Sequence, residues 1–208
     1  LLVDEAFPVG EFFAQQHGTF RRCVDDFAAT VVDEPGAGCF ADVQVDTLDE
    51  MFDVGQVVAH QPLPKGKRVA VVGNSDALGL LAADAAASNG LKVTKSVSLG
   101  STATASDFEK ALDDAIDDDR VDSVVAVYTP PLNTTGEAVA NVLAAVGEQS
   151  EKPLVSTFLA SEGVPELLRI PDLAGSVVGR GSVPSYPAVE SAVRALAKVA
   201  EYAAWRAL

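Results

Sequence analysis

Short apolar runs rich in valine alternate along the chain with alanine-rich segments whose apolar positions repeat at helical spacing. Such runs predict buried strands, and their regular alternation with helices is typical of βαβ units that build a parallel sheet. The expected strands cover residues 68–73, 92–99, 122–128, 153–159 and 182–185. The expected helices cover residues 78–88, about 106–118, 135–147 and 188–206, with a short helix at 165–168.

This order of elements predicts an α/β domain with three layers, in which a doubly wound parallel sheet lies between two layers of helices. Because crossovers between parallel strands are right-handed, few topologies remain, and we expect the flavodoxin-like strand order 2-1-3-4-5. A four-stranded variant is the alternative, since the run at 182–185 has the weakest strand pattern.

Cap residues set the expected helix boundaries. The candidate N-caps after the first strand are Asn74, Ser75 and Asp76, and Asn89-Gly90 is the expected C-cap of the same helix. In the next helix, Ser106 followed by Glu109 forms an expected capping box.

The N-terminal quarter of the chain differs from the rest. A helix is expected to open at Asp46 and run to about His60, and residues 62–66 (PLPKG) form a hinge into the first strand. Residues 1–45 show no clear period, and we interpret them as a connector or an N-terminal arm. The predicted division is therefore an arm at 1–45, a helix and hinge at 46–65, and a flavodoxin-like domain at 66–208.

Composition narrows the classes of partner. The 208 residues suffice for one core plus an appendage, and no apolar stretch reaches the roughly 18 residues of a membrane span, so we expect a soluble protein. The 15 basic and 30 acidic residues give a formal charge of -15, which repels phosphate backbones and anionic lipids. We therefore expect neither nucleic acid nor membrane partners, and an anionic ligand needs a local site of N–H groups or basic side chains.

Two cysteines, Cys23 and Cys39, are too few for a disulfide framework and lack zinc-ligand spacing, which favours a cytoplasmic setting. The sequence begins with Leu1, its only methionine is Met51, and no secretory signal opens it. We expect the chain to be part of a longer polypeptide.

Ligands of open α/β sheets bind outside the carboxyl ends of the strands, at the switch point beside the first strand. Two loops flank that point here, one after each central strand, and a helix N-terminus with free N–H groups follows the first loop. The candidate phosphate-binding residues in these loops are Gly73, Asn74, Ser75, Asp76, Ala77, Gly79 and Thr129.

Sharper motifs do not fit this loop. The glycines at 73 and 79 stand too far apart for a dinucleotide fingerprint, and Leu80 follows where a P-loop needs lysine. A flavodoxin would have a Ser/Thr-rich phosphate loop, and a response-regulator receiver would have an acidic residue where Tyr128 and Thr129 end the third strand. An ordinary turn whose polar residues cap the helix is the alternative, and Asp76 favours it by placing negative charge where a phosphate would lie.

Other polar residues have structural explanations. His60 ends a helix, where it complements the dipole, and His17 lies in unpatterned sequence without an obvious partner. The acidic run at 113–119 is expected on a solvated helix face and not at a metal site. Tyr202 and Trp205 are expected as core anchors or as a contact to a neighbouring subdomain. We therefore expect no catalytic residue and no metal ligand in this chain.

Several stretches, in order, resemble one family. The matching blocks are 45–53 (VDTLDEMFD), 59–64 (AHQPLP), 68–74 (RVAVVGN), 81–84 (LAAD), 127–131 (VYTPP) and 183–187 (VPSYP) with Glu190, Ala192, Ala195 and Leu196. Together they resemble the C-terminal flavodoxin-like subdomain of NDP-forming acyl-CoA synthetases, relatives of succinyl-CoA synthetase, over residues 45–208.

This resemblance implies a role in an enzyme that couples an acyl-CoA thioester to NTP synthesis through an acyl phosphate and a phosphohistidine. It implies that the helix after the first strand directs its N-terminus at the phosphohistidine. The implied partners are a CoA-binding domain, a phosphohistidine domain and an ATP-grasp module, which would handle CoA, ATP or ADP, and Mg in the full enzyme, so that this chain alone binds no cofactor. Some members also carry a GNAT acetyltransferase domain, so a fusion of that kind is compatible with the resemblance.

The chain departs from the family pattern at two places. Residues 75–78 (SDAL) stand where the family usually has a glycine-rich turn, and the family's Ser-His-Thr-Gly motif is absent, because His17-Gly18-Thr19 has the wrong order. Two hypotheses remain: a synthetase domain that is inactive alone, and a degenerate interaction or regulatory module of the same fold.

Overall fold

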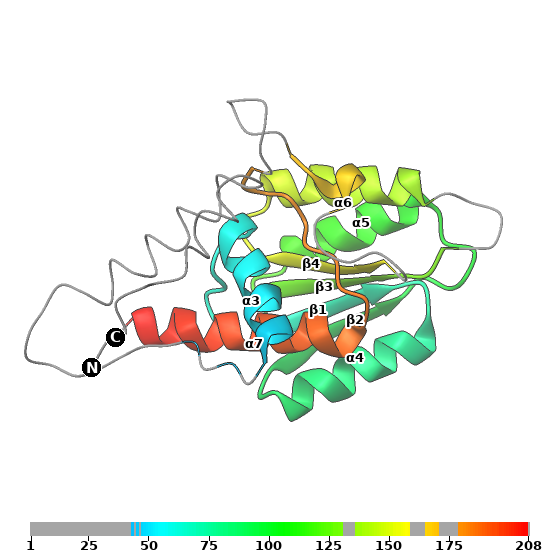
Figure 1. Cartoon of the computed structure of the whole chain (residues 1–208). Helices are drawn as coiled ribbons and strands as arrows, with labels where there is room; N and C mark the ends of the chain where they lie inside the picture. The colour runs from blue at the N-terminus through cyan, green and yellow to red at the C-terminus, as the bar shows by residue number, and fades with distance from the viewer. Residues whose placement is uncertain are drawn as a thin grey trace, which may run out of the picture.

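The computed structural model describes residues 43, 45, 47–130, 136–158, 165–170 and 179–207, and it shows a parallel sheet with helices on both faces (Figure 1). The elements, labelled as in Figure 1, are α3 (Leu48–His60), β1 (Arg68–Gly73), α4 (Asp76–Ser88), β2 (Lys92–Ser98), α5 (Ala105–Ile116), β3 (Ser123–Tyr128), α6 (Glu137–Gln149), β4 (Leu154–Phe158), the 3₁₀ helix η1 (Glu166–Leu168) and α7 (Val189–Arg206). The strands lie in the order β2-β1-β3-β4, all parallel. The predicted α/β class and the doubly wound, three-layer arrangement are confirmed.

The two faces of the sheet have separate cores. Val71 and Val127 point to the face that α4, α7 and α3 cover, whereas Val72 and Val124 point to the face that α5, α6 and η1 cover. Strands buried on both faces need apolar residues at every position, which is why β1 and β3 read as unbroken valine and alanine runs.

The predicted fifth strand forms only a single parallel bridge between Ser156 and Ser185 in the described part of the chain. Ser156 donates its N–H to the carbonyl of Pro184 and accepts a hydrogen bond from the N–H of Tyr186. Pro184 has no N–H group to continue a ladder, so the pairing ends after one residue. The strand order is therefore 2-1-3-4, with an extended segment beside β4 in place of strand 5.

The predicted capping box at Ser106 and Glu109 is wrong by two residues. The Thr104 hydroxyl accepts from the N–H of Asp107, and the Asp107 carboxylate accepts from the N–H of Thr104, so α5 begins at Ala105. Both pairs have the same three-residue spacing, and the structure uses the earlier one.

Some predictions fall outside the described residues: the arm up to residue 42 with His17, Cys23 and Cys39, the end of the loop at Pro131, and the proposed helix start at Thr135. Where α6 is described, Gly136 is its N-cap, with φ +68. None of the described helices has the length and apolar character needed to cross a bilayer.

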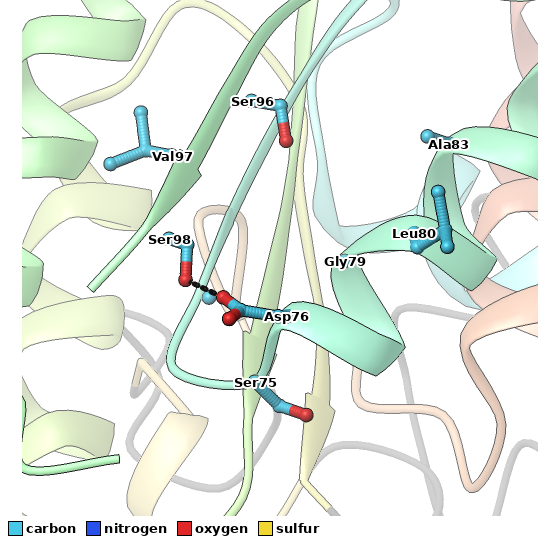
Figure 2. A pocket seen from close by; sticks show the side chains of 9 residues that line it. Ser75, Asp76, Gly79, Leu80, Ala83, Ser96, Val97 and Ser98 are labelled. Carbon is cyan, nitrogen blue, oxygen red and sulfur yellow. Dashed lines mark hydrogen bonds between the residues drawn. The ribbon is translucent and has the colours of Figure 1, made fainter. Parts of the chain in front are cut away.

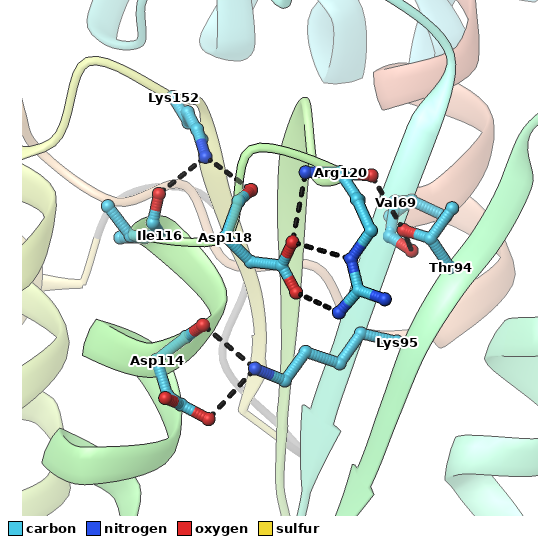
Figure 3. Close-up of polar contacts among 8 residues, drawn as sticks. All are labelled: Val69, Thr94, Lys95, Asp114, Ile116, Asp118, Arg120 and Lys152. Atoms are coloured by element: carbon cyan, nitrogen blue, oxygen red, sulfur yellow. Dashed lines mark hydrogen bonds and ion pairs between the residues drawn. The ribbon is translucent and has the colours of Figure 1, made fainter.

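Two aspartates of the acidic run at 113–119, Asp114 and Asp118, form ion pairs with basic side chains of the chain at the amino end of the sheet (Figure 3). Lys95 donates to both the carbonyl and the carboxylate of Asp114, and Arg120 donates to both carboxylate oxygens of Asp118. Lys152 donates to the carbonyls of Ile116 and Asp118, where the α5 dipole is negative. No group of three or more His, Cys, Asp or Glu side chains is gathered in a way that could hold a metal ion within the described ranges.

Asp122 joins β1 to the loop before β3. Its buried carboxylate accepts from the backbone N–H of Arg68 at 2.9 Å and from the guanidinium Nε and Nη2 at 2.8 and 2.6 Å. The hydrogen bonds from the Arg68 side chain lower the pKa of Asp122. Gly66 leaves space for this carboxylate, since a Cβ there would lie 2.5 Å from its Oδ2.

Asp122→Ala should lower the free energy of unfolding by about 2–3 kcal/mol at pH 7, because it leaves the Arg68 N–H without its acceptor. A lowered carboxylate pKa stabilises the fold above the unfolded-state pKa of about 4, so the difference between wild type and variant should shrink as the pH falls below about 4. Urea unfolding at several pH values measures this. Asp118→Ala, which removes an equally bidentate pair whose arginine, Arg120, is mostly exposed, should have a smaller effect. Equal effects of the two substitutions would contradict the assignment.

Candidate functional site

The switch point of the sheet lies between β1 and β3, where the strand order reverses. The chain leaves β1 into α4 on one face, while α5 precedes β3 on the other face. The loop after β1 and the first residues after β3 therefore meet at the carboxyl edge of the sheet, where the sequence predicted a site.

Asn74 joins these two segments. Its side-chain amide donates to the carbonyl of Thr129 and its oxygen accepts from the Thr129 N–H, both at 2.8 Å, and Asn74 is 5% exposed. Its own N–H donates to the carbonyl of Val127 at 3.2 Å. Gly73 permits this approach, because a Cβ at position 73 would lie 2.9 Å from both the Cβ and the carbonyl oxygen of Val127. Asn74 is thus occupied in holding the loop, and it is not a free helix cap.

The first turn of α4 has no side-chain cap. Ser75 is the N-cap residue, yet its side chain makes no cap hydrogen bond, and the first intrahelical bond runs from the N–H of Gly79 to the carbonyl of Ser75. The N–H groups of residues 76–78 precede that bond and have no partner within the helix. The N-terminus of α5, by contrast, is closed by its own Thr104 and Asp107. Of these two helix ends, α4 is the one that remains able to receive an anion.

Asp76 points sideways, toward β2. Its Oδ1 accepts a hydrogen bond from the Ser98 hydroxyl, and its side chain lines a cavity of about 260 Å³ between the first turns of α4 and the end of β2 (Figure 2). The negative charge is therefore held beside the helix axis. Ser75 points away from Ser98 in the same view.

Ser96 and Ser98 were not predicted as site residues, and a bulge explains their position. The pairing of β1 with β2 shifts by one residue between Val69 and Ala70, so Gly73 pairs with Ser98. A shift of one residue exchanges the two faces of a strand, and here it directs both serines to α4 while Val97 packs against the other core. No residue pattern in β2 predicted this bulge.

The remaining predicted residues lie at or near the loop. Ala77 is exposed in the first turn of α4, and Gly79, one turn on, lines the cavity and has open space around its α-carbon. The Oγ1 of Thr129 is buried and makes no hydrogen bond within the described residues, so Thr129 serves through its backbone. The structure thus brings the seven predicted residues to one edge of the sheet but does not show what they bind.

Two other features of the sequence lie away from this edge. His60 is buried at the end of α3, and its carbonyl accepts from the N–H of Gly181 at 2.7 Å. Tyr202 and Trp205 stack on α7 with ring centroids 6.1 Å apart, and both are only half-buried, so they are not core anchors.

Curated relatives of the chain are acyl-CoA ligases, although no family model matches it. The chain is 23% identical to the ADP-forming 4-hydroxybutyrate–CoA ligase of Nitrosopumilus maritimus, over 95% of this chain and 30% of the ligase. It is 22% identical to the alpha subunit of the ADP-forming acetate–CoA ligase I of Pyrococcus furiosus, over 77% of this chain and 38% of that subunit. The chain spans about a third of the length of these relatives.

Solved structures show the same fold. The dinucleotide-forming acetyl-coenzyme A synthetase 1 of Ca. Korarchaeum cryptofilum, in complex with phosphate and ADP, superposes with a TM-score of 0.63 at 19% identity, over 78% of this chain and 39% of that one. Its apo form gives a TM-score of 0.64 at 18% identity, over 99% and 53% of the two chains. The resemblance to part of an NDP-forming acyl-CoA synthetase is confirmed by these relatives together.

Asn74→Ala should lower the free energy of unfolding by about 1–3 kcal/mol, because it leaves the N–H and carbonyl of Thr129 without partners. Asn74→Asp should not rescue the loss, since a carboxylate can accept from the N–H but repels the carbonyl. Urea unfolding measures both. Asn89→Ala removes one local side-chain bond at the end of α4 and should cost less than about 1 kcal/mol. If the Asn74→Ala and Asn89→Ala proteins have the same urea midpoint, the hydrogen bonds from Asn74 to Thr129 contribute no more stability than the local bond of Asn89.

Proposed function

We propose that the chain is one domain of an NDP-forming acyl-CoA synthetase, the class of enzyme that converts acyl-CoA, NDP and phosphate to acid, CoA and NTP. The proposal is supported by relatives that are named as ADP-forming ligases of 4-hydroxybutyrate and acetate, and by the partial span of the chain on each of them. In the proposed enzyme this chain forms the flavodoxin-like domain over residues 66–208, with 46–65 as helix and hinge and 1–45 as a connector. The partners are a CoA-binding domain, a phosphohistidine domain and an ATP-grasp module.

The observation that carries the proposed role is the uncapped N-terminus of α4 at the switch point. In the proposed role this helix end faces the phosphoryl group during transfer, and the N–H groups of Asp76, Ala77 and Leu78 stabilise its negative charge. The Ser75 hydroxyl is a further donor. Asn74, Gly73 and Thr129 fix the position of the turn, as their hydrogen bonds and close packing indicate.

Asp76 is the main electrostatic obstacle to this role, and its orientation reduces the obstacle. The carboxylate bonds to Ser98 beside the helix, so the end of the helix axis is left to the N–H groups. In this position Asp76 repels a phosphate at the helix end less than a carboxylate lying over the first turn would, because Coulomb energy falls with distance.

A degenerate module of the same fold is the second candidate function. Residues 75–78 (SDAL) favour it, because they replace a glycine-rich turn with larger side chains and a negative charge. The two candidates differ in one measurable property, which is affinity for phosphate at the first turn of α4.

The purified chain alone should not form acyl-CoA from acid, CoA and ATP. The proposed role supplies one phosphate-facing helix end, while the phosphorylated histidine and the CoA and nucleotide sites belong to the proposed partner domains. A coupled assay for acid-dependent ADP formation tests this with acetate and 4-hydroxybutyrate as substrates. Turnover above the rate without enzyme would contradict the assignment.

Asp76→Gly should raise the affinity for phosphate. Removing a carboxylate about 4 Å from a phosphate relieves on the order of 1–4 kcal/mol of repulsion, and the sideways orientation favours the lower value, about five-fold in affinity. The loss of stability should not exceed about 1 kcal/mol, the usual contribution of an acidic residue in a first helical turn. Titration of the ¹⁵N-labelled protein with phosphate at constant ionic strength measures the binding.

Asp84→Ala is the matched control, since it removes the same charge from the exposed face of the same helix two turns away. It should change phosphate affinity less than Asp76→Gly does. If phosphate binds neither the wild type nor the Asp76→Gly protein at the first turn of α4, the anion site is refuted and the degenerate module stands.

A further inference from the structure

We infer that the cavity between α4 and β2 receives an arginine side chain of a partner polypeptide, whose adjoining apolar side chains cover Leu80. This inference deepens the proposed function by naming the chemistry of one surface through which the domain contacts the rest of the synthetase. Only the origin of the partner rests on the proposed function, because the surface itself follows from the side chains described above.

The cavity has one ionic wall and one apolar wall. The Asp76 carboxylate and the hydroxyls of Ser96 and Ser98 form the first, and Leu80 and Ala83 form the second (Figure 2). A long cationic side chain has the same division, with a charged head and an apolar stem.

Among the residues that the structure describes, no basic side chain lines this cavity. Lys95 on β2 is bound to Asp114, and Lys92 lies at the opposite end of the strand from Ser98, about 20 Å away at 3.3 Å per residue. Helix α4 carries Asp76 and Asp84 but neither lysine nor arginine. Within the described contacts the Asp76 carboxylate accepts a hydrogen bond from the Ser98 hydroxyl and forms no ion pair with a basic side chain.

Arginine fits this wall better than lysine. A guanidinium group has five N–H donors in a plane and binds a carboxylate with two parallel hydrogen bonds. Its remaining donors match the hydroxyl oxygens at positions 96 and 98. An ammonium group has three donors around a point charge and holds its water more strongly, so it gains less from this arrangement.

The rim of the cavity is apolar and open. Leu80, which lines the cavity, is 73% exposed. An exposed leucine at the mouth of a cavity offers apolar area that a partner side chain can cover. The stretch 77–83 has no charged residue, whereas Asp76 and Asp84 stand at its ends.

A second copy of this chain does not supply the basic side chain through an isologous contact across α4. An isologous contact across α4 would bring the same two aspartates together from both copies, without any basic residue on that helix. Each copy also has a formal charge of -15, which opposes self-association. We therefore assign the cavity to a segment of a partner polypeptide, with an arginine between apolar residues.

The test uses the peptide acetyl-Ala-Leu-Arg-Leu-Ala-amide and the same peptide with citrulline in place of arginine, which keeps the shape and removes the charge. We expect the arginine peptide to shift the ¹⁵N signals of Asp76, Gly79, Leu80, Ser96 and Ser98, and to bind about five-fold more tightly than the citrulline peptide. Asp76→Asn should abolish the difference between the peptides, while Asp84→Asn should preserve it. Leu80→Ser should weaken both peptides, while Leu167→Ser, at another exposed leucine, should weaken neither.

Equal binding of the two peptides, shifts confined to other surfaces, or no shift at millimolar peptide would overturn the inference. So would a dimer, detected by sedimentation equilibrium, that Leu80→Ser dissociates, because the occupant would then be a second copy. Arginine-dependent binding without phosphate binding would sustain this surface and refute the phosphate role, whereas phosphate binding without peptide binding would do the reverse.

Discussion

The two hydrogen bonds between the Asn74 side chain and the backbone of Thr129 fix the edge of the sheet on which the rest of the site depends. β1 and β3 pair from Val69 to Gly73, and after these pairs the segments that follow the two strands diverge toward opposite faces of the sheet. A ladder that ends at this point leaves a donor and an acceptor unpaired in a region where Asn74 is buried. A carboxamide carries both a donor group, its NH2, and an acceptor, its oxygen, so Asn74 satisfies both groups of Thr129. The start of α4 is thereby placed at a defined distance from β3.

The sequence predicted the elements whose residues face a core. It did not predict features for which several local arrangements were possible. β1 was predicted with its observed limits, because a strand buried on both faces needs an unbroken apolar run and polar or glycine residues at its ends. Ser106 with Glu109 matches the usual capping-box pattern of Ser or Thr followed three residues later by Glu or Gln, yet the observed box uses Thr104 with Asp107. Pro184 argues against a fifth strand, since proline interrupts a ladder. The sequence alone does not say which neighbour the segment pairs with, so it does not say whether the missing N–H of Pro184 would have been needed.

The candidate site shows the same limit at the level of single side chains. The switch-point rule located the loop, and helix-end physics selected its N–H groups, yet neither rule gave the direction of the Asp76 side chain. That direction depends on Ser98, which reaches α4 only because β2 contains a one-residue bulge. Without the bulge, Val97 would pair with Gly73 and face α4 in place of Ser98. A carboxylate beside valine would have no hydroxyl partner on β2, and the nearest donors would be the N–H groups of its own helix.

Asp76 therefore links the two proposed ligands electrostatically. The same carboxylate repels a phosphate at the first turn of α4 and attracts a guanidinium group in the cavity beside it. When the guanidinium is bound, the negative charge nearest the phosphate is neutralised, so each ligand raises the affinity for the other by the same factor. If both proposals hold, the domain would bind phosphate weakly when separate and more strongly within its assembly.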